Sequence, residues 1–292
     1  MKVFLICLAV VFNSFAITVS QSTAGQLVYN LIGNNVIIAN GIVSCSDSTA
    51  GLYQDNNIMA GNMAELFHGV VLSTGNVFSL NTNENTGSSS TLIGLPGDED
   101  LELLIDNNEN SYDATYIEFD FIPMVTGTMY LSYQFASEEY YFNYDPQYEL
   151  YHDVFAVFLD GDNIATLPNG QNISINTVNQ YENTEYFNGN YYNDIATEVN
   201  GFTDGFLFNK QVVEGQTYHI KLGITDIRDP HYDSYVFFGK NSLWVESSDP
   251  NDDGLLKGIQ SGLNVPDEGT YIPLLMGFFL IFGILIKNKK KC

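Results

Sequence analysis

The sequence predicts an all-β protein: a jelly-roll-like β-sandwich with long acidic and Tyr/Asn-rich loops, followed by one C-terminal hydrophobic helix. Short runs of apolar or alternating residues recur along the chain, which is the pattern of strands. Asn, Gly and Ser residues separate these runs, and helical periodicity is almost absent. With 45% hydrophobic and 14% aromatic residues, the 292-residue chain can bury a substantial core.

The N-terminal end has the features of a secretory signal peptide. Lys2 precedes the apolar run 3–12, and small residues at Ala16 and Ser20 are suited to cleavage. We therefore assign residues 1–20 to the signal peptide, with the mature chain beginning near Ile17 or Gln21.

Residues 21–246 are expected to form the β-sandwich domain. Within it, only residues 58–66 have the pattern of a short helix. The strands are expected over residues 36–38, 69–72, 117–121, 128–136, 154–159, 218–226 and 235–238. Residues 129–160 are the centre of this pattern, because an alternating strand, an acidic Tyr-rich loop and a fully apolar strand follow one another there.

Two connections between these strands are rich in carboxylates. Glu138 and Glu139 follow one strand and Asp153 precedes the next, and three aspartates occupy a second connection. Oxygen ligands that converge from loops are what a hard cation such as Ca²⁺ requires. The sequence therefore predicts a calcium site with ligands drawn from Glu138, Glu139, Asp153, Asp226, Asp229 and Asp233. The alternatives are a solvated acidic rim without an ion, or isolated carboxylates that cap turns.

The net charge of −25 limits the possible partners. Between Leu27 and Glu246 the basic residues are Lys210, Lys221, Arg228 and Lys240. Nucleic acid is not expected as a partner because no basic face is available to neutralise phosphates. Such an excess of carboxylates also destabilises a compact state, and bound divalent cations would relieve the repulsion.

Three cysteines are present, at Cys7, Cys45 and Cys292. Because Cys7 lies in the signal peptide and Cys292 is the last residue, no internal disulfide is expected in the mature ectodomain. Cys45 is interpreted as a small buried residue and not as a nucleophile.

The C-terminal part has the organisation of an anchor. Residues 247–270 form a linker, the apolar run 271–286 is expected to be a transmembrane helix, and the lysine-rich residues 287–292 a cytoplasmic tail. This arrangement places the domain outside the cell, secreted or held at the surface by its C-terminal segment.

Seven stretches of the sequence match motifs of one known family and occur in the same order as in that family, at residues 69–75, 96–98, 118–121, 135–140, 153–155, 174–179 and 217–222. Together they resemble the bacterial choice-of-anchor L domain. The resemblance implies a secreted or surface β-rich domain joined to a C-terminal anchor, without an established enzymatic activity.

A second resemblance concerns Val265, Pro266 and Asp267, which precede the apolar run and the lysine cluster. This arrangement resembles a PEP-CTERM-type sorting signal of the Val-Pro-Asp variety. The resemblance implies cleavage near the motif by exosortase, a membrane transpeptidase. An ordinary single-span anchor is the alternative.

Catalytic residues are not predicted. His-Glu-x-x-His and Gly-x-Ser-x-Gly motifs are absent from the sequence, and acidic pairs alone do not indicate a glycosidase. The function expected from the sequence is a noncatalytic binding or adhesion module for extracellular matrix, glycan or a surface protein. The alternative is a secreted polysaccharide hydrolase.

Overall fold

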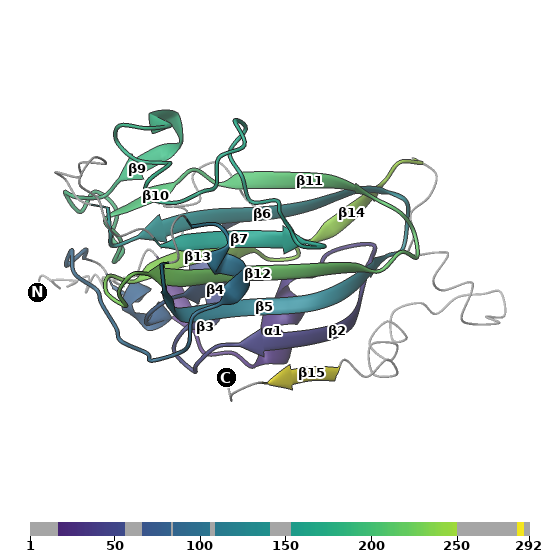
Figure 1. Ribbon diagram of the computed structural model, residues 1–292, viewed down its shortest axis with the longest axis horizontal. Coiled ribbons are helices and arrows are strands. Elements are labelled where there is room, and N and C mark those ends of the chain that lie inside the picture. The colour runs from purple at the N-terminus through teal and green to yellow at the C-terminus, as the bar shows by residue number, and fades with distance from the viewer. Residues whose placement is uncertain are drawn as a thin grey trace, which may run out of the picture.

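The computed structural model describes residues 17–55, 66–82, 84–105, 109–140, 153–249 and 285–288, and its core is two facing β-sheets (Figure 1). The nine-stranded sheet has the order β1 (Ile17–Ser20), β3 (Ala50–Asp55), β4 (His68–Ser73), β13 (Ser234–Gly239), β6 (Gly127–Ser137), β10 (Gly201–Thr203) and β9 (Phe187–Gly189). Two further strands, β11 (Phe206–Val212) and β14 (Trp244–Ser247), also pair with β6.

The six-stranded sheet has the order β15 (Leu285–Asn288), β2 (Val36–Ser44), β5 (Ser111–Pro123), β12 (Tyr218–Ile227), β7 (Val154–Leu159) and β8 (Asp162–Asn163). β15 lies parallel to β2, whereas β2, β5, β12, β7 and β8 pair in antiparallel fashion. The predicted β-rich, two-sheet architecture is confirmed. The jelly-roll connectivity stays a prediction.

Strand alternation builds the core between the sheets. On β6 the odd-numbered residues Met129, Leu131, Tyr133 and Phe135 are buried in one cluster with Phe155 of β7. The rings of Phe135 and Phe155 stack with centroids 6.3 Å apart, which joins the two sheets directly. Burial of apolar surface of this kind is the main force that holds two such layers together.

The opposite face of the nine-stranded sheet is also buried near the ends of β6 and β13. Ala136, Tyr235 and Phe237 belong to a second cluster, which the 3₁₀ helix η2 (Val77–Leu80) covers. The polar residues Ser132 and Gln134, which lie on this face of β6, are buried as well. Gln134 is satisfied there because its Nε2 donates to the Thr203 backbone oxygen at 2.8 Å.

Helices are few and short among the described residues. Helix α1 (Ala24–Leu31), which was not predicted, begins with a capping box in which Thr23 and Gln26 bond reciprocally. It buries Leu27 and Leu31 in the inter-sheet core. Helix α2 (Glu99–Glu102) begins at Asp98, whose carboxylate accepts two backbone N–H groups, and η3 (Thr184–Tyr186) precedes β9. Residues 58–65 of the other predicted helix lie outside the described residues.

The two ends of the chain are only partly described. Residues 1–16 lie outside the described residues, whereas Ile17–Ser20 form β1 inside the folded sheet. The expected C-terminal helix lies outside them up to residue 284, and its last two residues belong to β15. In the described part of the chain, no helix is long and apolar enough to cross a membrane.

Cys45 is buried, as predicted, with 1% of its surface exposed. It is also disulfide-bonded, which differs from the expectation that the mature ectodomain has no internal disulfide. The other cysteines of the sequence, Cys7 and Cys292, lie outside the described residues. The prediction depended on both of them being absent from the mature domain.

Candidate functional site

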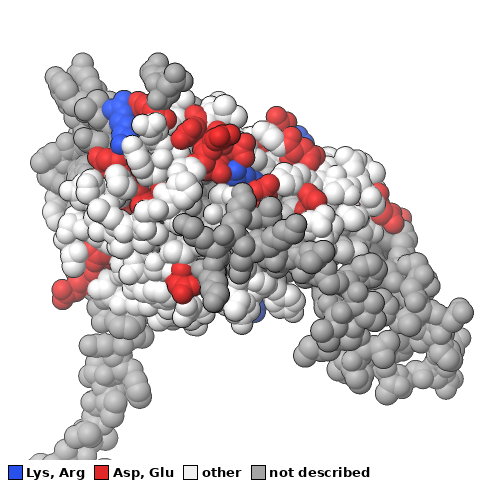
Figure 2. All heavy atoms as spheres, turned by 60° about the horizontal axis from the view of Figure 1, so that its bottom comes forward, with Lys and Arg blue, Asp and Glu red and all other residues white. Residues whose placement is uncertain are grey.

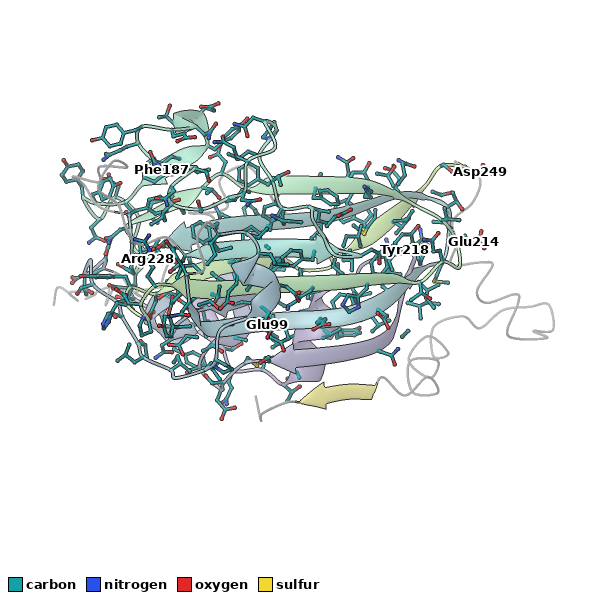
Figure 3. The ribbon with its side chains drawn as sticks, in the orientation of Figure 1. Glu99, Phe187, Glu214, Tyr218, Arg228 and Asp249 are labelled. Carbon is teal, nitrogen blue, oxygen red and sulfur yellow. The ribbon has the colours of Figure 1, made fainter. Side chains whose placement is uncertain are left out.

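The acidic connections meet where four strands of the two sheets begin or end. β6 ends beside the start of β13, with Ser137 opposite Ser234, and β12 ends beside the start of β7, with Thr225 opposite Val154. In Figure 3, Tyr218 and Arg228 mark the two ends of β12, and the acidic residues belong to the Arg228 end. Residues from two distant connections are therefore brought to one end of the sandwich.

Five of the six predicted ligands are buried there and do not form an exposed rim. Their exposed fractions are 0% for Glu138, 2% for Glu139, 0% for Asp153, 3% for Asp226 and 3% for Asp233. Buried carboxylates are costly unless they are neutralised or hydrogen-bonded. This burial is therefore the feature of the site that needs a chemical explanation.

The contacts of these residues divide them into two groups. Glu139 accepts the backbone N–H of Asp153 between the sheets, whereas the charges that act on Glu138 are those of Glu198 and Asp233. We call Glu139, Asp153 and Asp226 the inner group. The outer group is Glu138 and Asp233 together with Glu198, a residue that the sequence did not single out.

The inner group lies between the ends of the sheets. The backbone N–H of Asp153 donates to Glu139 Oε2 at 3.2 Å, and that of Ile227 donates to Asp153 Oδ1 at 3.3 Å. Among the described residues, Asp153 Oδ2 and Asp226 Oδ1 have no hydrogen-bond partner. Burial raises the pKa of Asp153, and burial together with the Asp153 charge raises the pKa of Asp226. Two ionised carboxylates are disfavoured in this position.

The outer group lies under the loops that cover the nine-stranded sheet. Asp233 accepts the backbone N–H of Thr91 at 2.6 Å and of Asn76 at 3.2 Å, and Glu198 accepts that of Thr86 at 3.1 Å. A Cβ at Gly75 would lie 2.0 Å from Asp233 Cγ, so only glycine leaves room for this carboxylate.

Glu138 differs from the other two members of the outer group, because neither of its carboxylate oxygens has a hydrogen-bond partner in the described part of the chain. Burial, followed by the charges of Glu198 and Asp233, raises the pKa of Glu138 to about 9. Glu138 is thus a buried acid that faces two other acids.

Asp229 does not join either group. It is half-buried in the turn after β12, where its carboxylate accepts the backbone N–H of His231 at 3.1 Å. Conversely, the structure adds Asp113, which is 1% exposed and whose charge contributes to the raised pKa of Asp226. Asp113 and Glu198 lie far from the acidic connections in sequence, and only the fold brings them near.

The oxygen donors of both groups are suited to a hard cation, and unpartnered buried oxygens are what such an ion would satisfy. The arrangement of the side chains is less complete. The described residues contain no group of three His, Cys, Asp or Glu side chains already placed to hold a metal ion. An ion would therefore draw the carboxylates closer and recruit backbone oxygens or water.

Two cavities lie elsewhere on the domain. One, of about 490 Å³, is lined by Val154, Arg228 and the segment 170–177, and the other, of about 470 Å³, is lined by residues of β1, β3 and β4. None of the six predicted ligands lines either cavity. Figure 2 shows that acidic side chains outnumber basic ones on the visible face.

Comparison with protein families matches the choice-of-anchor L domain to residues 16–244. The chain belongs to the choice-of-anchor L domain family. This family is usually extracellular or surface-associated and is not known for enzymatic activity. The part of the sequence-based prediction that concerned the family is thereby confirmed.

The other comparisons add little to this choice-of-anchor L domain. No curated protein matches its sequence significantly. Among solved structures, a β-glucosidase from Kluyveromyces marxianus shares 11% identity over 54% of the chain, with a TM-score of 0.24. The match spans 13% of that protein's chain, and a similarity of this size supports no functional argument.

Proposed function

We propose that this choice-of-anchor L domain is a noncatalytic binding or adhesion module, secreted or anchored at the cell surface and stabilised by calcium. Its partner would be extracellular matrix, a glycan or a surface protein. Family membership supports a surface-associated, noncatalytic role. The observation that carries the calcium proposal is the burial of carboxylate oxygens without hydrogen-bond partners among the described residues at the strand ends.

The inner group is the first candidate for the ion. Two carboxyl groups that face each other in a buried position must hold a proton or share a cation, because their repulsion is poorly screened there. Calcium accepts six to eight oxygen ligands in flexible geometry, so it tolerates a mixture of carboxylate, backbone and water oxygens. Glu139, Asp153 and Asp226 would supply the carboxylates.

Polysaccharide hydrolysis is not favoured by the geometry. A glycosidase needs two carboxylates that reach the scissile bond of a bound sugar. Here Glu138 and Asp153 are fully buried, and the two cavities described above are lined by other residues. The acidic residues are therefore better suited to a structural ion than to catalysis.

Surface attachment would come from the C-terminal segment. Val265, Pro266 and Asp267 resemble the recognition part of a sorting signal, and the apolar run 271–286 with its lysine tail would enter the membrane. Exosortase is the proposed processing enzyme. These residues lie outside the described part of the chain except at 285–286.

Thermal unfolding in chelator, magnesium and calcium tests the calcium proposal. With a Kd of about 10 μM, calcium at about 1 mM would stabilise the folded state by about 2.7 kcal/mol, which raises the melting midpoint by several degrees. Magnesium is expected to do less because it requires tighter octahedral geometry. Equal midpoints in all three solutions, with no calcium retained after gel filtration, would contradict the proposal.

The calcium effect is expected to grow with pH. Burial raises the pKa of Asp153 above its ordinary value of about 4, so the stability due to its protonated form is complete below pH 4. That contribution is lost as the pH rises through the folded-state pKa. Calcium binds the deprotonated carboxylates, so it should offset this loss, most strongly at the alkaline end.

A further inference from the structure

We infer that the outer group, Glu138, Asp233 and Glu198, is a second cation site separate from the inner group, so that the domain binds two divalent cations that prefer oxygen ligands. This inference rests on the proposed calcium function and extends it to a residue, Glu198, that no sequence pattern indicates. It divides one predicted acidic site into two sites on opposite faces of the nine-stranded sheet.

The separation follows from the contacts of two neighbouring side chains. β6 ends at Ser137, and Glu138 lies in the bend that follows the strand. Glu139 approaches the Asp153 backbone between the sheets, whereas Glu138 lies beside the cluster that contains Ala136 and Tyr235.

The main chain of β6 and β13 lies between the two groups. The Glu138 backbone N–H donates to the Asp233 backbone oxygen at 3.1 Å, and the hydroxyl groups of Ser137 and Ser234 are hydrogen-bonded at 2.8 Å. An ion bound to Glu139 and Asp226 would therefore lie on the other side of the sheet from the Glu138 carboxylate.

The environment of Glu138 is the observation that indicates a bound ligand. Its side chain is fully buried, and neither carboxylate oxygen has a hydrogen-bond partner among the described residues. The charged groups that face it are the carboxylates of Glu198 and Asp233. Leaving a buried polar group unsatisfied costs free energy, and native structures rarely do so without a bound water, ion or functional reason.

The basic side chains of the domain do not supply the missing charge. Lys221 and Arg228 pair with carboxylates outside the outer group. Lys210 and Lys240 are exposed on the surface. Among the described residues, lysine and arginine therefore do not neutralise Glu138, which must hold a proton or share a cation from solution.

The other two carboxylates are already held in place by the loops that cover the sheet. Glu198 accepts the backbone N–H and the hydroxyl group of Thr86, and Asp233 accepts the backbone N–H of Thr91 and the hydroxyl group of Ser89. An ion that joins Glu138 to them would connect the segments 84–91 and 190–200 to the end of β6. The outer site would thus order the loops, whereas the inner site joins the two sheets.

Calcium stoichiometry tests this inference. Native mass spectrometry of the full secreted protein, after exchange from chelator into calcium, is expected to show two bound ions. Glu198→Gln and Glu138→Gln should each reduce the number to one. Asp226→Asn should also leave one ion, because it affects only the inner group. Glu185→Gln is the matched control, since Glu185 is exposed in η3 on the other side of β9 and should leave two ions bound.

The fold of each variant can be followed separately by its melting midpoint in chelator. Glu138→Gln removes an unpartnered buried acid, so its midpoint in chelator should be equal to or above that of the wild type, while its calcium-dependent rise should be smaller. A single ion in the wild type that Glu198→Gln retains and Asp226→Asn abolishes would overturn the second site and leave the proposed function intact. Absence of bound calcium in every variant and in the wild type would overturn both.

Discussion

His219 illustrates how a single residue on the surface depends on its neighbours. Its Nε2 lies 3.0 Å from Glu118 Oε1 and its Nδ1 lies 2.8 Å from Asp120 Oδ1. A neutral imidazole has only one N–H donor, so both contacts are satisfied only when the ring is protonated. Burial lowers the pKa of His219, but the Asp120 and Glu118 carboxylates raise it more, and the net shift is upward.

We predict that NMR titration will give His219 a pKa above its ordinary value of about 6.5. The stability that its protonated form contributes should be complete below that value and should be lost as the pH rises through the folded pKa. His219→Asn should remove this part of the pH dependence, because asparagine does not titrate. A pKa at or below 6.5 would show that the two carboxylate contacts are not made together in solution.

The acidic site shows what could be predicted from the sequence at the scale of single residues. Five of the six carboxylates that the sequence singled out lie at one end of the sandwich, whereas Asp229 joins neither group. Their division into two groups was not predicted, because it depends on contacts with Asp153, Glu198 and Asp233 that only the fold creates. The burial of these carboxylates was not predictable from the sequence, because it depends on loops from distant segments that cover the strand ends.

Helix α2 is attached to the six-stranded sheet by one buried charge network. Lys221 Nζ on β12 lies 2.7 Å from both carboxylate oxygens of Asp98 and 2.5 Å from Asp100 Oδ2. Asp98 also caps α2, and the Lys221 ammonium group lies 4.6 Å from the centroid of the Tyr116 ring. The Lys221 side chain on β12 therefore contacts both the N-terminus of α2 and the Tyr116 ring on β5.

We predict that Lys221→Met will lower the free energy of unfolding by about 3 kcal/mol, because it leaves the Asp98 carboxylate buried and unpaired. The double variant Lys221→Met with Asp98→Asn should recover much of this loss, since asparagine still caps the helix and carries no charge. Urea denaturation provides the measurement. Lys210→Met on exposed β11 is the control, and equal effects of the two lysine substitutions would contradict the role of the buried network.

At the scale of elements, strands with clear alternation or a continuous apolar run were predictable. The structure places β7 at Val154–Leu159, the run that the sequence indicated. Helix α1 was missed, although Thr23 and Gln26 have the spacing of a capping box and Leu27 and Leu31 the spacing of one helical face. The helix is only two turns long, so its periodic signal is weak beside the strand pattern that surrounds it.

At the scale of the whole molecule, β6 and β13 of the nine-stranded sheet carry a second apolar layer on the face that points away from the six-stranded sheet. This layer joins β1, η2 and the segment from Val199 to Phe202, which come from three separate parts of the chain. Local periodicity describes which face of a strand is apolar but not which distant loop covers it. The two-sheet architecture was therefore predictable, whereas the covered outer face and the resulting burial of acids were not.

The position of β1 in the sheet bears on where the mature protein begins. Ile17 is fully buried and Val19 is 8% exposed, and β1 pairs with β3 along its whole length. The Asn81 side chain bonds the Val19 backbone N–H and oxygen at 2.6 and 3.1 Å, which completes the other edge. Cleavage after Ser20 would remove this strand, whereas cleavage after Ala16 would keep it.

We therefore predict that the mature protein from its own host begins at Ile17 and lacks residues 287–292 after sorting. Intact-mass measurement of the secreted protein gives both ends. A mass that begins at Gln21, or one that retains residues 287–292, would contradict the corresponding half of this prediction, and retention of 287–292 would favour an uncleaved anchor.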